Sequence, residues 1–67
     1  MDKWYNVEID KDNFELFRII LKSKHIKYEV SGTESFLVHL EIYCDEYEVN
    51  SLNKIIDGLD ELTQLPF

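Results

Sequence analysis

Cysteine, proline and glycine are all scarce in this sequence of 67 residues, which has one cysteine, one proline and two glycines. So little proline and glycine argues against a disordered, collagen-like or linker-rich chain. The lone Cys44 forms no intramolecular disulfide, which favours a reducing compartment. Apolar runs are no longer than three residues, far short of a membrane span, and the N-terminus does not resemble a signal peptide. We therefore expect a cytoplasmic protein with no membrane partner.

Basic residues are also few. Seven lysines and arginines stand against fourteen aspartates and glutamates, so the formal net charge is -7. Because such a surface repels phosphate backbones, we expect no nucleic-acid partner. The excess of carboxylates either keeps a small protein soluble or meets a basic protein surface, as a nucleic-acid mimic does. The composition leaves both interpretations open.

Motifs for catalysis are missing as well. There is no glycine-rich phosphate loop, no serine nucleophile elbow, and no Cys-x-x-Cys or His-x-x-x-His metal spacing. His39 and Glu41 are two residues apart, a spacing that lets a base and its supporting carboxylate share one strand face. His25 is better explained as a cation near a helix C-terminus, and the acidic neighbours of Cys44 oppose a thiolate. We predict no catalytic residue, cofactor, metal or enzymatic activity.

Residues 36–43 form the most regular stretch in the chain. Their even-numbered members are all apolar, and their odd-numbered members, Leu37, His39, Glu41 and Tyr43, are of mixed polarity. This period of two predicts a strand with one apolar and one mixed face. Residues 4–9 and 26–30 alternate in the same way and predict two more strands, the second of which forms a hairpin with residues 36–43.

Two helices are predicted around these strands. Apolar residues recur at intervals of three and four over about residues 13–23, and again over about residues 46–62. Asp10 or Asp12 is the candidate N-cap of the first helix, and Asp45 that of the second. The strands and helices are expected to share one core. On the sheet its members are Tyr5, Val7, Ile9, Ile26, Tyr28, Val30, Phe36, Val38, Leu40 and Ile42. On the helices they are Phe14, Leu16, Phe17, Ile20, Leu21, Val49, Leu52, Ile55, Ile56, Leu59 and Leu62.

The element order predicts an α+β fold, a single α/β-sandwich domain over residues 1–67. A right-handed crossover between the first two strands leaves room for the third between them. The result is a two-layer split β-α-β-β-α arrangement, with a three-stranded sheet in the order 2-3-1 and both helices on one face. This order resembles the ferredoxin-like fold, including ACT modules, without the fourth strand. The resemblance implies ligand sensing, although ACT modules have a glycine in the turn after the first strand and residues 10–13 have none.

The absent fourth strand leaves the outer edge of residues 4–9 unpaired, so two copies that pair there form one six-stranded sheet. The mixed face of the sheet has no predicted helix over it. Its exposed aromatics are either ordinary surface residues, or covered by Leu65 and Phe67 of the tail, or a contact for a partner. The candidate partner-binding residues are Trp4, Asn6, Glu8, Leu37, His39, Glu41 and Tyr43.

We interpret the sequence as a small acidic protein-interaction module without catalysis. It is expected to bind another protein or to self-associate as a homodimer through the sheet edge or the uncovered face. The alternatives are an acidic inhibitor or nucleic-acid mimic that binds a basic protein surface, and a small-ligand-sensing module of the ACT kind.

Overall fold

The computed structural model describes residues 1–63, and its elements follow the predicted order. The proposed covering role of Leu65 and Phe67 lies outside the described residues. The elements are β1 (Lys3–Asp10), the short 3-10 helix η1 (Lys11–Asn13), α1 (Phe14–Ser23), β2 (Lys27–Thr33), β3 (Leu37–Cys44) and α2 (Glu46–Thr63).

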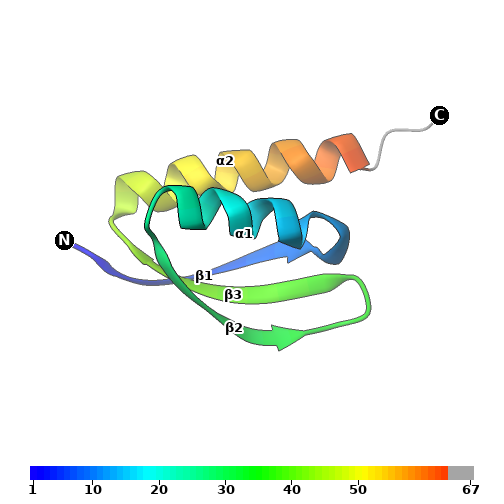
Figure 1. The fold of residues 1–67 in the computed structure, drawn as a ribbon, viewed down its shortest axis with the longest axis horizontal. Coiled ribbons are helices and arrows are strands. Elements are labelled where there is room, and N and C mark those ends of the chain that lie inside the picture. The colour runs from blue at the N-terminus through cyan, green and yellow to red at the C-terminus, as the bar shows by residue number, and fades with distance from the viewer. Residues whose placement is uncertain (64–67) are drawn as a thin grey trace.

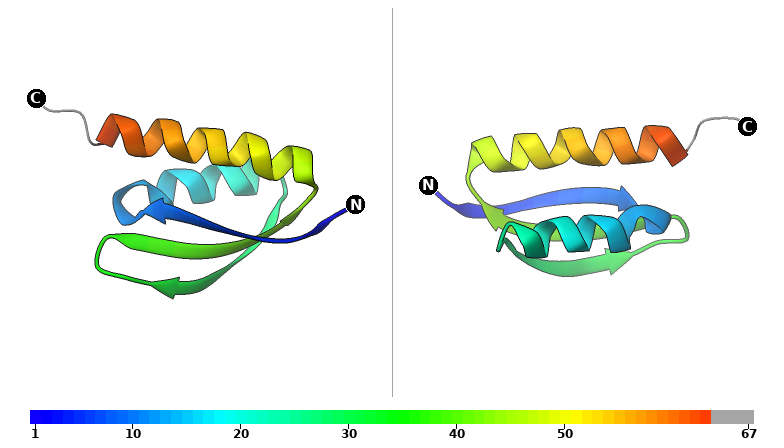
Figure 2. Two further views of the ribbon diagram at one scale, coloured as in Figure 1. Left: turned by 180° about the vertical axis from the view of Figure 1, so that it is seen from behind. Right: turned by 45° about the horizontal axis from the view of Figure 1, so that its top comes forward.

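The sheet has the order β1-β3-β2, which confirms the predicted topology. Both β1 and β2 pair antiparallel with β3, so the chain must cross the sheet through α1 to return in the same direction. The two helices lie side by side on one face of the sheet (Figure 1). Seen from behind, both helices again lie on the same side of the sheet (Figure 2). The fold is therefore the predicted split β-α-β-β-α sandwich.

The core lies between these two layers. Along β3 the even-numbered residues Val38, Leu40, Ile42 and Cys44 are all buried, as the period of two requires. They pack with the apolar stripes of both helices. Each large aliphatic or aromatic side chain that is fully buried contributes about 1.5–3 kcal/mol of transfer free energy. The largest fully buried side chains are Ile9, Phe17, Leu21, Leu40, Ile42 and Leu52.

The β2–β3 hairpin differs from the prediction at Phe36 and Val30. Phe36 is 80% exposed because β2 extends to Thr33, so that Phe36 lies in the turn before β3. The backbone oxygen of Phe36 accepts a hydrogen bond of 2.9 Å from the amide of Lys11. Val30 does pair with Leu40, but a bulge between Val30 and Gly32 follows at once, and Val30 on this edge strand is 48% exposed. Both residues were wrongly assigned to the core.

The apolar stripes of the helices are narrower than predicted. Leu16 on α1 and Leu62 near the end of α2 are exposed, whereas Phe17 and Leu52 are fully buried. Leu16 is one position before Phe17, so it is turned by about 100° from the buried direction of the helix. Leu62 belongs to the last turn of α2. Periodicity alone therefore overestimated the width and length of the buried stripe on the helices.

The two helix starts are capped differently. The amide of Glu48 donates a 2.7 Å hydrogen bond to Oδ1 of Asp45, which confirms the predicted N-cap of α2. Neither Asp10 nor Asp12 caps α1, because η1 intervenes and Asn13 occupies the N-cap position without a side-chain cap bond. The Asn13 side chain instead donates a 2.9 Å hydrogen bond to Asp60 of α2. The start of α1 is therefore held by a tertiary contact with α2 and not by a side-chain cap.

Candidate functional site

The sheet face opposite the helices is the candidate functional site, and we call it the open face. In the register of β1 and β3, Trp4 lies opposite Tyr43, Asn6 opposite Glu41, and Glu8 opposite His39. Leu37 also belongs to this face and pairs with Asp10. The structure thus brings all seven of the predicted partner-binding residues onto one surface, while their role in binding stays a prediction.

One end of the open face is aromatic. The rings of Trp4 and Tyr43 have centroids 5.2 Å apart and are tilted by 55°. Trp4 is 47% exposed and Tyr43 38% exposed, so the pair packs together yet keeps a broad surface toward solvent. Lys27 of β2 lies opposite Tyr43 on the other side. Tryptophan and tyrosine in such a position are typical anchors of protein interfaces.

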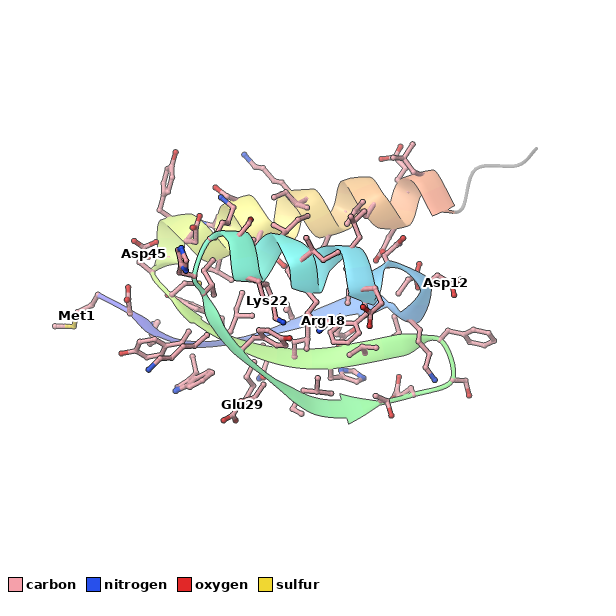
Figure 3. The ribbon with its side chains drawn as sticks, viewed as in Figure 1. Met1, Asp12, Arg18, Lys22, Glu29 and Asp45 are labelled. Atoms are coloured by element: carbon pink, nitrogen blue, oxygen red, sulfur yellow. The ribbon has the colours of Figure 1, made fainter. Side chains whose placement is uncertain are left out.

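The middle of the open face is acidic. Glu29 of β2 lies directly opposite Glu41 of β3, with Asn6 on the far side of Glu41. Figure 3 shows Glu29 pointing away from the layer of helices. Among the described residues, neither carboxylate forms a hydrogen bond or an ion pair. Two like charges in directly opposed positions destabilise a sheet, so this row weakens the free protein.

His39 lies between two carboxylates. Its Nδ1 is 3.7 Å from Oε1 of Glu8, and its Nε2 is 3.4 Å from Oε2 of Glu34. The sequence had suggested Glu41 as the supporting carboxylate, but the charged neighbours of His39 are Glu8 across the ladder and Glu34 from the turn. Ser31 lines the same shallow hollow as His39. With both ring nitrogens directed at carboxylates, His39 is not placed to accept a proton from Ser31.

Glu29, Glu34 and Lys27 are contributors to this surface that the sequence reasoning did not select. As charges on an edge strand, Glu29 and Lys27 also discourage edge pairing, and Glu34 lies in the turn between β2 and β3. The signal for Glu29 was present, because the predicted hairpin brings β2 alongside the mixed face of β3. The pairing of Glu29 with Glu41 depends on the register, which the bulge at Val30/Gly32 shifts.

The other candidate residues lie away from the open face. Cys44 is the last residue of β3 and is buried. Burial raises the pKa of the Cys44 thiol, and the nearby carboxylates of Glu48, Asp45 and Asp2 raise it further. A raised pKa opposes nucleophilic chemistry. His25 follows α1 with a left-handed φ of 57°, and its amide donates to the carbonyl of Lys22, so its backbone helps to end the helix.

Within residues 1–63 no cluster of three or more histidine, cysteine, aspartate or glutamate side chains is arranged to hold a metal ion. In the same part of the chain, no helix is both long and apolar enough to cross a membrane. Comparison of the chain with models of protein families, with curated proteins and with solved structures finds no match.

Proposed function

We propose that this protein is a small acidic protein-interaction module without catalysis, acting in the cytoplasm, whose contact surface is the open face together with the free edge of β1. The observation that carries the proposal is the half-exposed Trp4–Tyr43 pair on a sheet face that no described element covers. A small domain gains stability by covering such aromatic surface with a helix. Leaving it in solvent is typical of a surface that meets a partner.

Self-association through β1 is the first form of this proposal. Of the two sheet edges, β2 has a bulge, a device that discourages edge pairing. By contrast, β1 pairs with β3 over eight residues without a register shift. Its outer edge is regular and suited to an added strand. Two copies joined there build a sheet of six strands with the helices on one side.

The side chains of β1 tolerate this pairing. In a two-fold antiparallel arrangement centred on Asn6, Glu8 lies opposite Trp4 of the second copy. In one centred on Val7, Glu8 lies opposite Asn6 of the second copy. Neither register sets two like charges opposite each other within Lys3–Asp10, so the strand itself holds no like-charge pair against the dimer. A dimer that joins two open faces would instead bring Glu29 and Glu41 of both copies together.

The test is the mass of the protein in solution, measured by light scattering over a range of concentrations, with hydrogen exchange read on each strand. We expect a dimer in which the amides of β1 become more protected as concentration rises. The amides at the outer edge of β2 serve as the internal control and should not change. If the protein is a monomer at all concentrations and the hydrogen exchange of the β1 amides does not change, self-association through β1 is contradicted.

The wider proposal, that the open face contacts another protein, is tested by affinity capture from the native host. The bait is the wild-type chain, and the matched control is the double variant Trp4→Ser with Tyr43→Ser, checked for folding by circular dichroism. A partner identified with the wild type and lost with the folded variant supports the proposal. A monomeric protein that retains no partner, or retains the same partners in both forms, contradicts it.

A further inference from the structure

The opposed carboxylates of Glu29 and Glu41 weaken the free protein without an internal partner to balance them. Glu41 is half-buried, which strengthens the repulsion because less water screens it. The next row along β3 holds Tyr43 and Trp4, whose rings face the same side. Successive rows on one face are about 7 Å apart. A carboxylate pair therefore lies within side-chain reach of an exposed aromatic pair.

Carboxylates outnumber cations on the open face. Glu8 and Glu34 flank His39 in the row beyond Glu41. Among the strand residues that face this side, Lys27 is the single lysine or arginine. A surface with this composition is complementary to a cationic partner. It repels nucleic acid and anionic membranes, which are the other common large partners of small proteins.

We infer that the open face binds a basic protein segment through arginine side chains that stack on Trp4 and Tyr43 and pair with Glu41 and Glu29. A guanidinium group is planar, stacks on aromatic rings and binds carboxylates through a fork of N–H donors. Both kinds of contact are available in adjacent rows of this face. The inference rests on the proposed function and names the chemistry of the partner for the face, while the edge of β1 serves the second copy.

A second copy does not fit the open face. A two-fold interface sets the same patch of both subunits together, and the row of Glu29 and Glu41 in the middle of the open face lies near the axis, so the carboxylates of the two copies would face each other. Bringing like charges together in a desolvated interface is strongly unfavourable. The partner must therefore be a different protein with a basic segment. An extended segment with arginines at alternate positions matches the spacing of the rows.

The test uses a synthetic heptapeptide in which arginine and serine alternate, titrated into the full chain at low salt. Trp4 is the one tryptophan of the sequence, so its fluorescence reports binding on this face directly. We expect saturable quenching or a spectral shift of Trp4. A lysine–serine peptide is expected to bind more weakly, because an ammonium group does not stack as guanidinium does. A glutamate–serine peptide should not bind.

Two matched double variants distinguish binding at a specific site from general attraction by the net charge of the protein. Glu29→Gln with Glu41→Gln removes two carboxylates from the open face, and Asp57→Asn with Glu61→Gln removes two exposed ones from α2. The variant on the open face should lower the affinity for the arginine peptide about tenfold, and the variant on α2 should lower it by less than about threefold. The first should also raise the melting temperature by about 2 °C or more, because it relieves the repulsion.

These outcomes decide the inference separately from the proposed function. Equal weakening by both double variants means attraction by net charge alone and overturns it. Failure of the arginine peptide to perturb Trp4 overturns it as well, although a captured partner of other chemistry would still support the interaction module. A monomer that binds the arginine peptide at the open face keeps this inference and removes self-association through β1.

Discussion

The two faces of β3 differ sharply, although their residues alternate along one strand. On the inner face, Val38, Leu40, Ile42 and Cys44 are at most 5% exposed and pack beneath two helices. On the open face, His39, Glu41 and Tyr43 keep contact with water. The inner face contributes to stability through burial. The open face includes a row of opposed carboxylates, and their repulsion reduces the stability of the domain.

The two faces are therefore subject to different physical constraints. An inner-face position is fixed by the volume and polarity of the core, whereas an open-face position is free to serve contact with other molecules. A side chain that opposes stability without an internal reason is better explained by a partner than by the fold. Substitutions at matched positions on the two faces should therefore differ in their effect on stability.

The largest effect is expected from Leu40→Asp. Leu40 is fully buried, and the variant loses its packing and introduces a carboxylate with no partner. The loss exceeds the roughly 3–10 kcal/mol that stabilises a domain of this length, so we expect an unfolded chain by circular dichroism. The matched Leu37→Asp, on the open face of the same strand, should stay folded and lose at most roughly 1–2 kcal/mol. A folded Leu40→Asp protein would falsify the register.

Two phenylalanines give the next contrast. Phe17 is fully buried between the helices and the sheet, and Phe36 is 80% exposed at the hairpin turn. We expect Phe17→Ala to lower the free energy of unfolding by about 3–5 kcal/mol. Phe36→Ala should change it by less than about 0.5 kcal/mol. Urea denaturation measures both, and similar losses for the two variants would show that Phe36 packs as the alternation had predicted.

A smaller effect is expected from the aromatic pair of the open face. A double-mutant cycle with Trp4→Ala and Tyr43→Ala isolates the coupling between the two rings, whose centroids are 5.2 Å apart. We expect a coupling of about 0.5–1.5 kcal/mol in urea denaturation. Coupling near zero would mean that the pair does not form in solution.

The smallest effect at neutral pH concerns Cys44 on the inner face. Burial raises the pKa of its thiol, so the folded protein binds the proton more tightly than the unfolded chain. The contribution of Cys44 to stability is thus complete below the ordinary thiol pKa of about 8.5 and is lost as pH rises through the folded pKa. Tyrosines and lysines titrate in the same range, so the comparison is between the wild type and Cys44→Ala.

We expect the free energy of unfolding of the wild type to fall more steeply above about pH 8.5 than that of Cys44→Ala. Parallel curves would contradict a raised thiol pKa. Alkylation gives an independent readout, because the thiol should react slowly in native buffer and rapidly in urea. Equal reaction rates in both solvents would show that the end of β3 is open in the native state.

The element order, the sheet order and the seven residues of the open face followed from the sequence, because periods of two and of three to four distinguish strands from helices. The N-cap at Asp45 followed in the same way, from a local rule. The turn of the hairpin did not. The hairpin predicted from residues 26–30 and 36–43 has residues 31–35 as its loop, whereas β2 continues through Gly32 by means of a bulge, and Phe36 consequently leaves the core.

Alternation along one chain segment thus determined which side chains of β3 share a face, since it depends only on backbone geometry. The tertiary structure decided which residues of other segments lie beside them. Glu29 against Glu41, Glu34 against His39 and Asn13 against Asp60 are all contacts between different elements. Such contacts depend on the strand register and on the conformation of the turns. Both are determined by small differences in local free energy, which a sequence pattern does not reveal. For that reason the sequence predicted the open face, and the structure alone revealed the charge arrangement on it.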